Sequence, residues 1–350
     1  MISGVPQGSV LGPLLFLIFI GDISEGVNAS ILVYVDDSKV KANVRTPEDV
    51  ELLQEDLDKI YSWERRNNMQ FNGGKFLVLR YGKNQELKEN TIYFTGEMEE
   101  TITGVNQCRD LGVIMQDDAS FTLQQEKVAI KVRQKCGWVL RTFYSRNQKF
   151  MKHMWNTLIQ PHLDYCSQLW APTEGAELEK LEGLLRSFTS KIPAVKSLNY
   201  WERLSNLKLN SLQRRNERYR IIYTWKILEG LVPNCGVEEI SESENTRLGR
   251  SCSISKLTGS NQIKKLRNQS FQSIGPRLFN SLPRELRNLK GVEVDNFKEH
   301  LDRYLTEVPD QPKVPGMMPT CLTSDSIPSN SLLHWIPLMS REAVWRRPGA

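Results

Sequence analysis

The chain has 350 residues, of which 39% are hydrophobic and 25% are charged, and its formal net charge at pH 7 is +5. This length and balance are typical of a soluble, multi-part protein with enough apolar side chains for two globular units. The six cysteines include no Cys-x-x-Cys pair, which excludes a zinc knuckle and a disulfide framework and indicates a reducing, intracellular setting.

The first recognisable segment is a glycine-containing loop that runs into an apolar stretch. The loop reads Ser3-Gly4-Val5-Pro6-Gln7-Gly8-Ser9. Its glycines allow backbone to approach a ligand closely, and Gln7 offers an amide that contacts a base or a sugar without regard to charge. The apolar stretch, residues 10–20, is too short to cross a bilayer and lacks the basic leader of a signal peptide. We therefore expect a buried helix that ends near Asp22, with no membrane span and no targeting signal.

Two adjacent carboxylates, Asp36 and Asp37, follow at the junction of two short runs, residues 31–35 and residues 38–42. This pattern predicts a β-hairpin whose tight turn lifts the acids clear of the strands. Carboxylate oxygens bind Mg²⁺, and phosphoryl-transfer sites use them to hold two such ions. The alternative is an ordinary solvated turn, which is how we interpret the second Asp-Asp pair, residues 117–118.

The next segment is predicted to be an amphipathic helix followed by a turn and a strand. Thr46 is placed to cap the helix, and apolar residues recur at helical spacing from Val50 to Ile60, which indicates core packing. A strand is expected over residues 76–81. The turn before it reads Asn72-Gly73-Gly74-Lys75. On residue type alone, Lys75 is a solvated turn lysine.

Beyond residue 121 the pattern changes to long, basic helices. Residues 124–143 and 151–170 have helical periodicity. Residues 121–230 carry 19 basic and 9 acidic side chains, whereas residues 1–60 carry 4 basic and 10 acidic ones. An acidic segment combined with a basic one is the asymmetry expected of a metal site beside a nucleic-acid channel.

A basic cluster occupies neighbouring turns of one predicted helix, residues 212–220. Its members are Arg214, Arg215, Arg218 and Arg220. They either neutralise phosphates of a nucleic acid, in which case binding weakens steeply with salt, or form a solvated helical face. The spacing does not decide between the two.

In combination, the glycine loop and the hairpin resemble the palm of a reverse transcriptase from non-LTR retrotransposons of the jockey-like and chicken-repeat-like kinds. The loop continues as Val10-Leu11-Gly12-Pro13, like the family's template-gripping loop and helix. Tyr34-Val35-Asp36-Asp37 is similar to its metal-binding hairpin, which usually has Phe-Ala in place of Tyr34-Val35, a difference that bears on substrate preference. Five later segments fit the family's order: Asn72-Gly73-Gly74-Lys75, Cys108-Arg109-Asp110-Leu111-Gly112-Val113-Ile114, Tyr200-Trp201-Glu202-Arg203-Leu204, residues 212–220, and Phe279-Asn280-Ser281-Leu282-Pro283.

The resemblance implies an α+β fold in four parts. A partial polymerase palm, a small antiparallel sheet with packed helices, is expected at residues 1–120. An all-α thumb follows at residues 121–232 and a mixed, irregular C-terminal region at residues 233–308. The last part, residues 309–350, is punctuated by prolines without periodicity, so we expect a disordered tail.

The resemblance also implies an RNA-directed DNA polymerase, a nucleotidyltransferase that extends a DNA primer on an RNA template with Mg²⁺ and deoxynucleoside triphosphates. Asp36 and Asp37 would be its catalytic metal ligands, and Lys75 would protonate the leaving pyrophosphate. The residues that would contact template or nucleotide are Gln7, Gly8, Tyr34 and Val35. The arginines of residues 212–220 would contact the duplex backbone. A nuclear location is expected, and no protein partner is inferred.

One expectation limits the activity of this chain. The family places a third carboxylate and basic fingers before the glycine loop, whereas here Met1 stands two residues before Ser3. Because two-metal chemistry needs all its acids within tight tolerances, we expect the truncated chain to be inactive by itself. The alternative to a polymerase fragment is a non-catalytic retroelement relic that only binds nucleic acid through its basic thumb.

Overall fold

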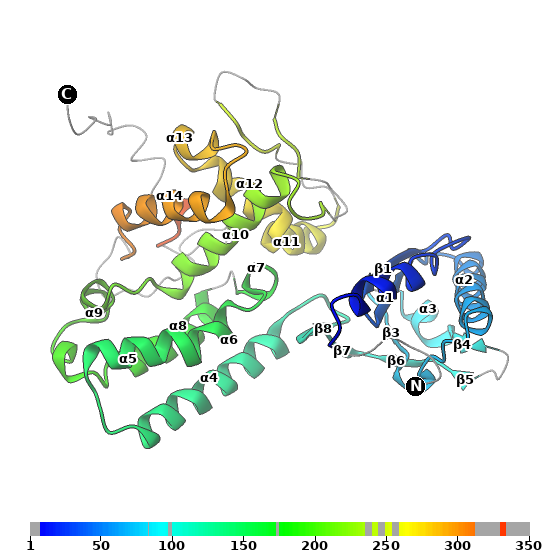
Figure 1. The fold of residues 1–350 in the computed structure, drawn as a ribbon, viewed down its shortest axis with the longest axis horizontal. Helices are drawn as coiled ribbons and strands as arrows, with labels where there is room; N and C mark the ends of the chain where they lie inside the picture. Colours follow the sequence, from blue (N-terminus) through cyan, green and yellow to red (C-terminus); the bar gives the residue numbers. More distant parts are fainter. Residues whose placement is uncertain are drawn as a thin grey trace. The chain divides into compact units, whose positions relative to one another are not determined.

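The computed structural model describes residues 8–82, 84–96, 100–172, 175–234, 240–243, 249–253, 259–311 and 330–333. The chain divides into two compact units, Met1–Ser120 (unit 1) and Phe121–Ala350 (unit 2), which run from blue to cyan and from green to red in Figure 1. Unit 1 combines short strands with helices, and the described part of unit 2 is helical, which confirms a mixed α+β class. No helix in the described ranges has the length and apolar character needed to cross a membrane.

The described residues of unit 1 form four separate two-stranded sheets rather than one sheet. Its elements are α1 Gly12–Ile20, β1 Ser30–Tyr34, β2 Asp37–Lys41, α2 Pro47–Arg66, η1 Gly73–Lys75, β3 Leu77–Leu79, α3 Gln85–Asn90, β4 Phe94–Thr95, β5 Glu100–Thr101, β6 Thr103–Val105, β7 Gln107–Asp110 and β8 Val113–Gln116. Strands β1–β2, β4–β5 and β7–β8 are antiparallel hairpin-like pairs, and β3–β6 is parallel. The prediction of a single antiparallel sheet is therefore wrong for the described residues. The strands are two to five residues long, and the three antiparallel pairs join strands that are consecutive in the chain, whereas β3 pairs with β6 across two intervening strands.

Helix α2 forms where the sequence predicts it. The Thr46 hydroxyl accepts a hydrogen bond from the Asp49 N–H at 3.4 Å, and the Asp49 carboxylate accepts one from the Thr46 N–H at 2.9 Å. This reciprocal pair satisfies two backbone donors of the first turn. Leu57 and Ile60 are buried, and Trp63 joins Ile60 in a core cluster. The predicted core stripe is confirmed.

Helix α1 is not buried as predicted. Its side chains Leu14, Leu17 and Ile18 are 54%, 54% and 69% exposed. The helix is held at its C-terminal end, where Ile20 enters the core and the Phe19 ring meets the edge of Trp63 at 5.7 Å between centroids. Phe16 also packs against this core cluster, whereas most other apolar side chains of the helix stay exposed, although its composition is that of a buried helix.

The segment at residues 108–114, one of those that fit the family's order, forms the hairpin β7–β8. Its two-residue turn places Leu111 at φ +42° and Gly112 at φ +90°. Two positive φ values in succession are typical of a type I′ turn, which matches the twist of the flanking strands. Leu-Gly is therefore a turn sequence here, with Val113 buried in the strand that follows.

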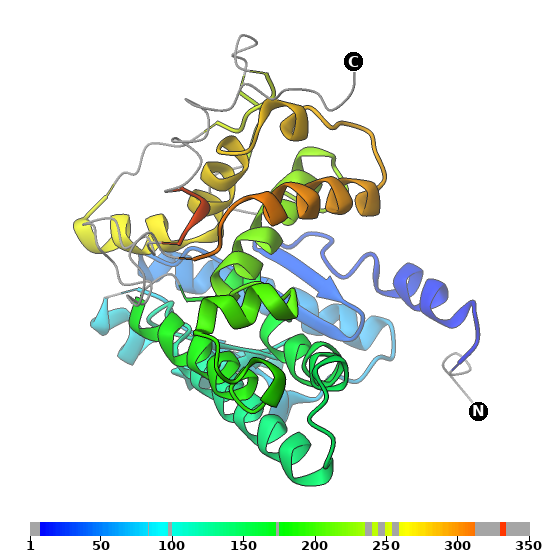
Figure 2. The ribbon, with the colours of Figure 1, turned by 90° about the vertical axis from the view of Figure 1, so that its left-hand side faces the viewer.

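Unit 2 is built from helices and short helical turns. Its elements are α4 Thr122–Thr142, α5 Gln148–Met154, the π-helical turn η3 Trp155–Ile159, α6 Gln160–Asp164, α7 Ser167–Trp170, α8 Gly175–Thr189, η4 Pro193–Val195, α9 Tyr200–Leu207, α10 Leu212–Leu228, α11 Asn261–Gln269, α12 Phe271–Asn280, α13 Arg284–Arg287 and α14 Val294–Glu307. Helix α4 confirms the predicted helix over residues 124–143. Helices α10 and α14 cross each other in both Figure 1 and Figure 2.

The predicted continuous helix over residues 151–170 is wrong. Pro161 lacks an N–H and its ring clashes with the carbonyl four residues earlier, so a regular helix cannot pass through it. The chain instead forms the π turn η3 just before α6, and it breaks again at Cys166, whose φ is +53°.

One core connects α10 with the C-terminal helices of unit 2. The rings of Trp225 in α10 and Phe297 in α14 are stacked, with centroids 4.4 Å apart and planes at 7°. The Asn280 amide donates to the Cys252 carbonyl at 2.9 Å and accepts from the Cys252 N–H at 2.7 Å. The Phe-Asn-Ser-Leu-Pro segment is thus a packing element: Phe279 and Leu282 are buried, and Asn280 fixes the loop at residue 252.

The tail predicted over residues 309–350 contains a packed segment. Residues 330–333, red in Figure 2, lie beside α10 and α14, and Leu332 belongs to the same core cluster as Phe297. Residues 309–311 are also described, and they carry the partly buried carboxylate of Asp310. Both pieces are tied to the start of α10: the Asp310 carboxylate accepts from the Ser211 hydroxyl, and the Ser331 hydroxyl donates to Glu217. Residues 312–329 and 334–350 lie outside the described residues.

Candidate functional site

The two acids lie at the tip of the hairpin β1–β2, one residue out of the predicted register. Tyr34 pairs with Asp37, so the turn consists of Val35 and Asp36, and Asp37 is the first residue of β2. The alternation of side chains along a strand then puts Asp37 on the same face as Tyr34, opposite to the face of Ile31 that packs on the core. The hairpin thus presents both acids away from the core.

The turn is strained at Val35. This residue has φ +57°, whereas Asp36 has no positive φ. That combination is typical of a type II′ turn, whose first central position normally requires glycine. A β-branched residue in the left-handed region costs about 1–3 kcal/mol, and such strain concentrates at functional sites.

The strain gives a testable expectation. We expect Val35→Asn to stabilise unit 1 by about 1 kcal/mol, because asparagine tolerates positive φ and Val35 is half exposed. Chemical denaturation monitored by tryptophan fluorescence measures the change. The matched control is Val33→Asn in β1, which should lose stability because β-branched residues favour strands. If Val35→Asn lowered the free energy of unfolding as much as Val33→Asn does, the turn at Val35 would not be strained.

Both carboxylates are free to bind a cation. Asp36 and Asp37 are exposed, and no hydrogen bond or ion pair to them is found within the described ranges. Two adjacent, unpaired carboxylates fit the oxygen preference of Mg²⁺. They are nevertheless only two: the described residues contain no group of three or more acidic, histidine or cysteine side chains arranged for a metal ion. A cation held here would complete its coordination with water or phosphate oxygens.

The other predicted site residues of unit 1 are placed only in part. Gly8 has φ +82°, a conformation that favours glycine, and Gln7 lies outside the described residues. Lys75 ends η1 with an exposed side chain, and within the described part of unit 1 no bond joins it to Asp36 or Asp37. Its role as a proton donor stays a prediction.

An ion pair that the sequence analysis did not find connects the hairpin to β7. The Lys39 ammonium contacts the two carboxylate oxygens of Asp110 at 2.5 and 2.6 Å. Lys39 follows Asp37 by two positions in β2 and therefore shares its face. Because Asp110 holds this ammonium, Lys39 does not neutralise the acids of the turn. No local pattern indicates the pair, since 71 residues separate its partners.

The arginines predicted to bind phosphate have partners within unit 2. Arg214 and Arg220 are buried, at 0% and 3% exposure. Arg214 donates to the Pro309 carbonyl at 2.8 Å, and Arg220 donates to the Ala171 carbonyl at 2.9 Å. In this conformation neither guanidinium reaches a phosphate at the surface, because the helix around them is covered.

The remaining two arginines form ion pairs. Arg215 contacts Asp164 at 2.5 Å, and Arg218 donates to Asp302 at 2.7 Å. Binding a phosphate would require each to leave its carboxylate. None of the four guanidinium groups in this cluster is therefore free to bind a phosphate in this conformation.

A different basic surface, which the sequence analysis missed, lies on α4. We call it the α4 stripe: Lys127, Lys131, Gln134, Trp138 and Arg141, all exposed and spaced by three or four residues. This spacing puts them on one helical face, which is distinct from the face of the buried valines. Trp138 is 43% exposed, and the Lys135 ammonium lies 5.7 Å from its ring centroid. No salt bridge to these basic residues occurs in the part of the chain that the structure describes.

Comparisons of the chain with known proteins agree with one another. Residues 2–115 match the family model "Reverse transcriptase (RNA-dependent DNA polymerase)". The chain is 26% identical over 204 residues to the RNA-directed DNA polymerase from mobile element jockey of Drosophila funebris, covering 54% of this chain and 22% of that protein. It is 22% identical over 191 residues to the probable RNA-directed DNA polymerase from transposon X-element of Drosophila melanogaster, covering 52% and 21%. The chain spans about a fifth of the length of these relatives. No solved structure matches it significantly.

Proposed function

The chain is a distant relative of the reverse transcriptases of the jockey and X-element retrotransposons, and from this premise we propose that it forms part of an RNA-directed DNA polymerase. The observation that supports this best is the pair of exposed, unpaired carboxylates of Asp36 and Asp37 on a tight turn inside the matched region. In this proposal unit 1 is palm and the helices α4 to α10 belong to the thumb. The substrates are deoxynucleoside triphosphates, a DNA primer and an RNA template.

The proposed chemistry is transfer of a nucleotide to a primer 3′-oxygen, which forms a bond to the α-phosphorus as pyrophosphate leaves. Asp36 and Asp37 would hold Mg²⁺, which neutralises charge on the reacting phosphate oxygens when it is bound. Tyr34 and Val35, together with Gln7 and Gly8, are proposed to contact template and nucleotide. Lys75 is proposed to donate a proton to the leaving pyrophosphate.

The proposal also covers activity of the chain by itself. Two-metal catalysis requires several carboxylate oxygens in fixed positions, and the described residues gather only Asp36 and Asp37 at the turn. We therefore propose that the 350-residue chain binds a divalent cation without extending a primer.

Mn²⁺ binding by the chain tests the metal site directly, because bound and free Mn²⁺ differ in their electron paramagnetic resonance signal. We expect Asp36→Asn to weaken binding about tenfold, equivalent to about 1.4 kcal/mol, because one of two carboxylates is lost. Asp117→Asn, in the other Asp-Asp pair, is the matched control and should leave binding unchanged. Equal effects of the two variants would contradict a cation site at the hairpin.

A second function, nucleic-acid binding through the α4 stripe, rests on a separate observation. The stripe combines exposed lysine and arginine side chains with an exposed tryptophan. In nucleic-acid-binding proteins, such basic side chains contact the phosphates and such aromatic rings stack on the bases. Its basic side chains are not held by acids in the described part of unit 2, unlike Arg215 and Arg218. The stripe therefore replaces the arginine cluster as the proposed contact surface.

Salt-dependent binding of an RNA–DNA hybrid tests the α4 stripe. We expect Lys131→Gln and Arg141→Gln each to lower the slope of log affinity against log salt by about one, because each removes about one phosphate contact. Trp138→Ala should weaken binding by about 1–3 kcal/mol if a base stacks on it. Arg133→Gln, on the same helix but off the stripe, is the control. An unchanged slope in both stripe variants would rule the surface out.

A further inference from the structure

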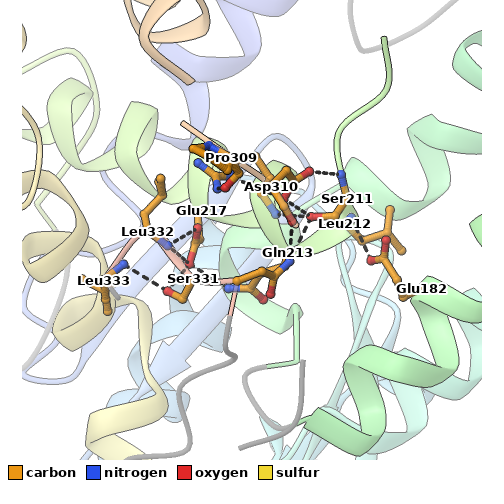
Figure 3. Close-up of polar contacts among 12 residues, drawn as sticks. Glu182, Ser211, Leu212, Gln213, Glu217, Pro309, Asp310, Ser331, Leu332 and Leu333 are labelled. Atoms are coloured by element: carbon orange, nitrogen blue, oxygen red, sulfur yellow. Dashed lines mark hydrogen bonds and ion pairs between the residues drawn. The ribbon is translucent and has the colours of Figure 1, made fainter. Parts of the chain in front are cut away.

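A short C-terminal segment, residues 330–333, is sealed into unit 2. Leu332 has no exposed surface, and Asn330 and Ser331 are each 1% exposed. Figure 3 shows the segment together with the N-terminal half of α10, and Leu332 lies in the core cluster of α10 and α14. Three consecutive buried residues that include two polar side chains need hydrogen bonds for most of their polar groups, and here the Asn330 side-chain carbonyl oxygen is the buried side-chain atom of the segment without a partner among the described residues.

The segment supplies hydrogen bonds to a buried carboxylate. Glu217 in α10 accepts from the Ser331 hydroxyl and from the Leu332 N–H, the latter at 3.1 Å. Its third donor is the Gln213 amide at 2.8 Å. Because Glu217 is 1% exposed, water cannot replace these donors while the core stays closed. The segment therefore provides two of the three bonds that keep this carboxylate buried.

A second set of contacts closes the start of α10. Asp310 accepts from the Ser211 N–H at 2.6 Å and from the Ser211 hydroxyl at 2.7 Å. The Asn330 amide contacts the same hydroxyl at 3.4 Å, so both pieces of the C-terminal region meet at the N-cap of α10 (Figure 3). A carboxylate at a helix N-terminus is also favoured by the helix dipole.

We propose that residues 330–333 are a C-terminal strap: a peptide element that docks on α10 and completes the fold of unit 2. The partner that this surface recognises is a short neutral peptide with a hydroxyl followed by leucine, since Glu217 takes the hydroxyl and backbone donors and the core takes the leucine. The packing of α10 thus depends on contacts with a segment that lies more than 100 residues later in the sequence. The strap also keeps Glu217 closed off from solvent.

Truncation and peptide rescue test the strap. The chain is shortened to end at residue 311, which removes the strap and keeps Asp310. We expect its thermal midpoint to fall by about 5–15 °C, because a buried leucine and two hydrogen bonds to a buried carboxylate are lost. A synthetic peptide of residues 328–335 should bind the shortened chain and raise the midpoint in a saturable way. The same peptide with Leu332→Asp should do neither.

Point variants of the full chain test the strap even if the shortened chain does not fold. Leu332→Ala and Ser331→Ala should each lower the midpoint, whereas Leu231→Ala, an exposed leucine of the same unit, should not. Midpoints of both strap variants equal to the parent would overturn the proposal, as would a folded, shortened chain that ignores the peptide. A concentration-dependent dimer that exchanges the segment between copies would overturn the intramolecular assignment.

Discussion

Primer extension is expected to fall at least about 100-fold when Asp36 is replaced by asparagine, in a polypeptide that joins this chain to the upstream segment of the jockey reverse transcriptase. The Asn side chain keeps the size of Asp36 but carries no charge, so it cannot neutralise a divalent cation at the turn. The assay follows incorporation of deoxynucleotides on an RNA template with Mg²⁺. The 350-residue chain alone should give no product.

Three comparisons make this result interpretable. Asp117→Asn removes a carboxylate from the other Asp-Asp pair and should leave extension unchanged. Lys75→Gln tests the proposed proton donor separately and should lower the rate while cation binding stays as in the parent. Full activity of the Asp36→Asn variant would contradict the polymerase assignment, whereas activity of the chain alone would contradict only its predicted inactivity.

Local sequence patterns correctly predicted the elements whose partners are close in the chain. The hairpin at Asp36 and the cap at Thr46 are set by neighbours within a few residues, and both form. The turn register was off by one, because Val35 adopts a positive φ that a β-branched residue normally avoids. Residue preferences for turns favour aspartate over valine at the position that Val35 occupies.

The direction that a helix faces could not be predicted, because it depends on distant residues. Periodicity correctly grouped the arginines of α10 on neighbouring turns, but Arg214 is covered by residues 309–310. Helix α1 is a second example: its composition is that of a buried helix, but Leu14, Leu17 and Ile18 are more than half exposed. For the α4 stripe, the helical spacing of the basic residues and Trp138 can be read from the sequence. The sequence does not show that this face of the helix is exposed.

A buried acid in α8 leads to the second large effect. Glu182 is 1% exposed, and burial raises the pKa of its carboxyl to about 7. It accepts hydrogen bonds from the Tyr200 hydroxyl and from the Leu212 N–H, the latter at 2.9 Å, and these partly offset the burial. The carboxyl therefore connects α8 to the starts of α9 and α10, and Figure 3 shows its contact with Leu212 at the start of α10.

The sign of the pH effect follows from this raised pKa. Between pH values of about 4.5, the ordinary pKa of the group, and about 7, the unfolded chain has lost the proton and the folded chain keeps it. The unfolded state then binds fewer protons, so the free energy of unfolding decreases as pH rises through this window. Over the whole window the contribution of Glu182 is on the order of 3 kcal/mol.

We expect Glu182→Gln to remove this part of the pH dependence, because glutamine resembles the protonated carboxyl and does not titrate. Denaturant unfolding of unit 2 at several pH values between 4.5 and 8 measures the slope. Burial also raises the pKa of Glu217 and of Asp310, so the decisive quantity is the difference in slope between parent and variant. Glu177→Gln, at a partly exposed ion pair in the same helix, is the control. If parent and Glu182→Gln lose stability equally as pH rises, Glu182 does not stay protonated in the folded chain.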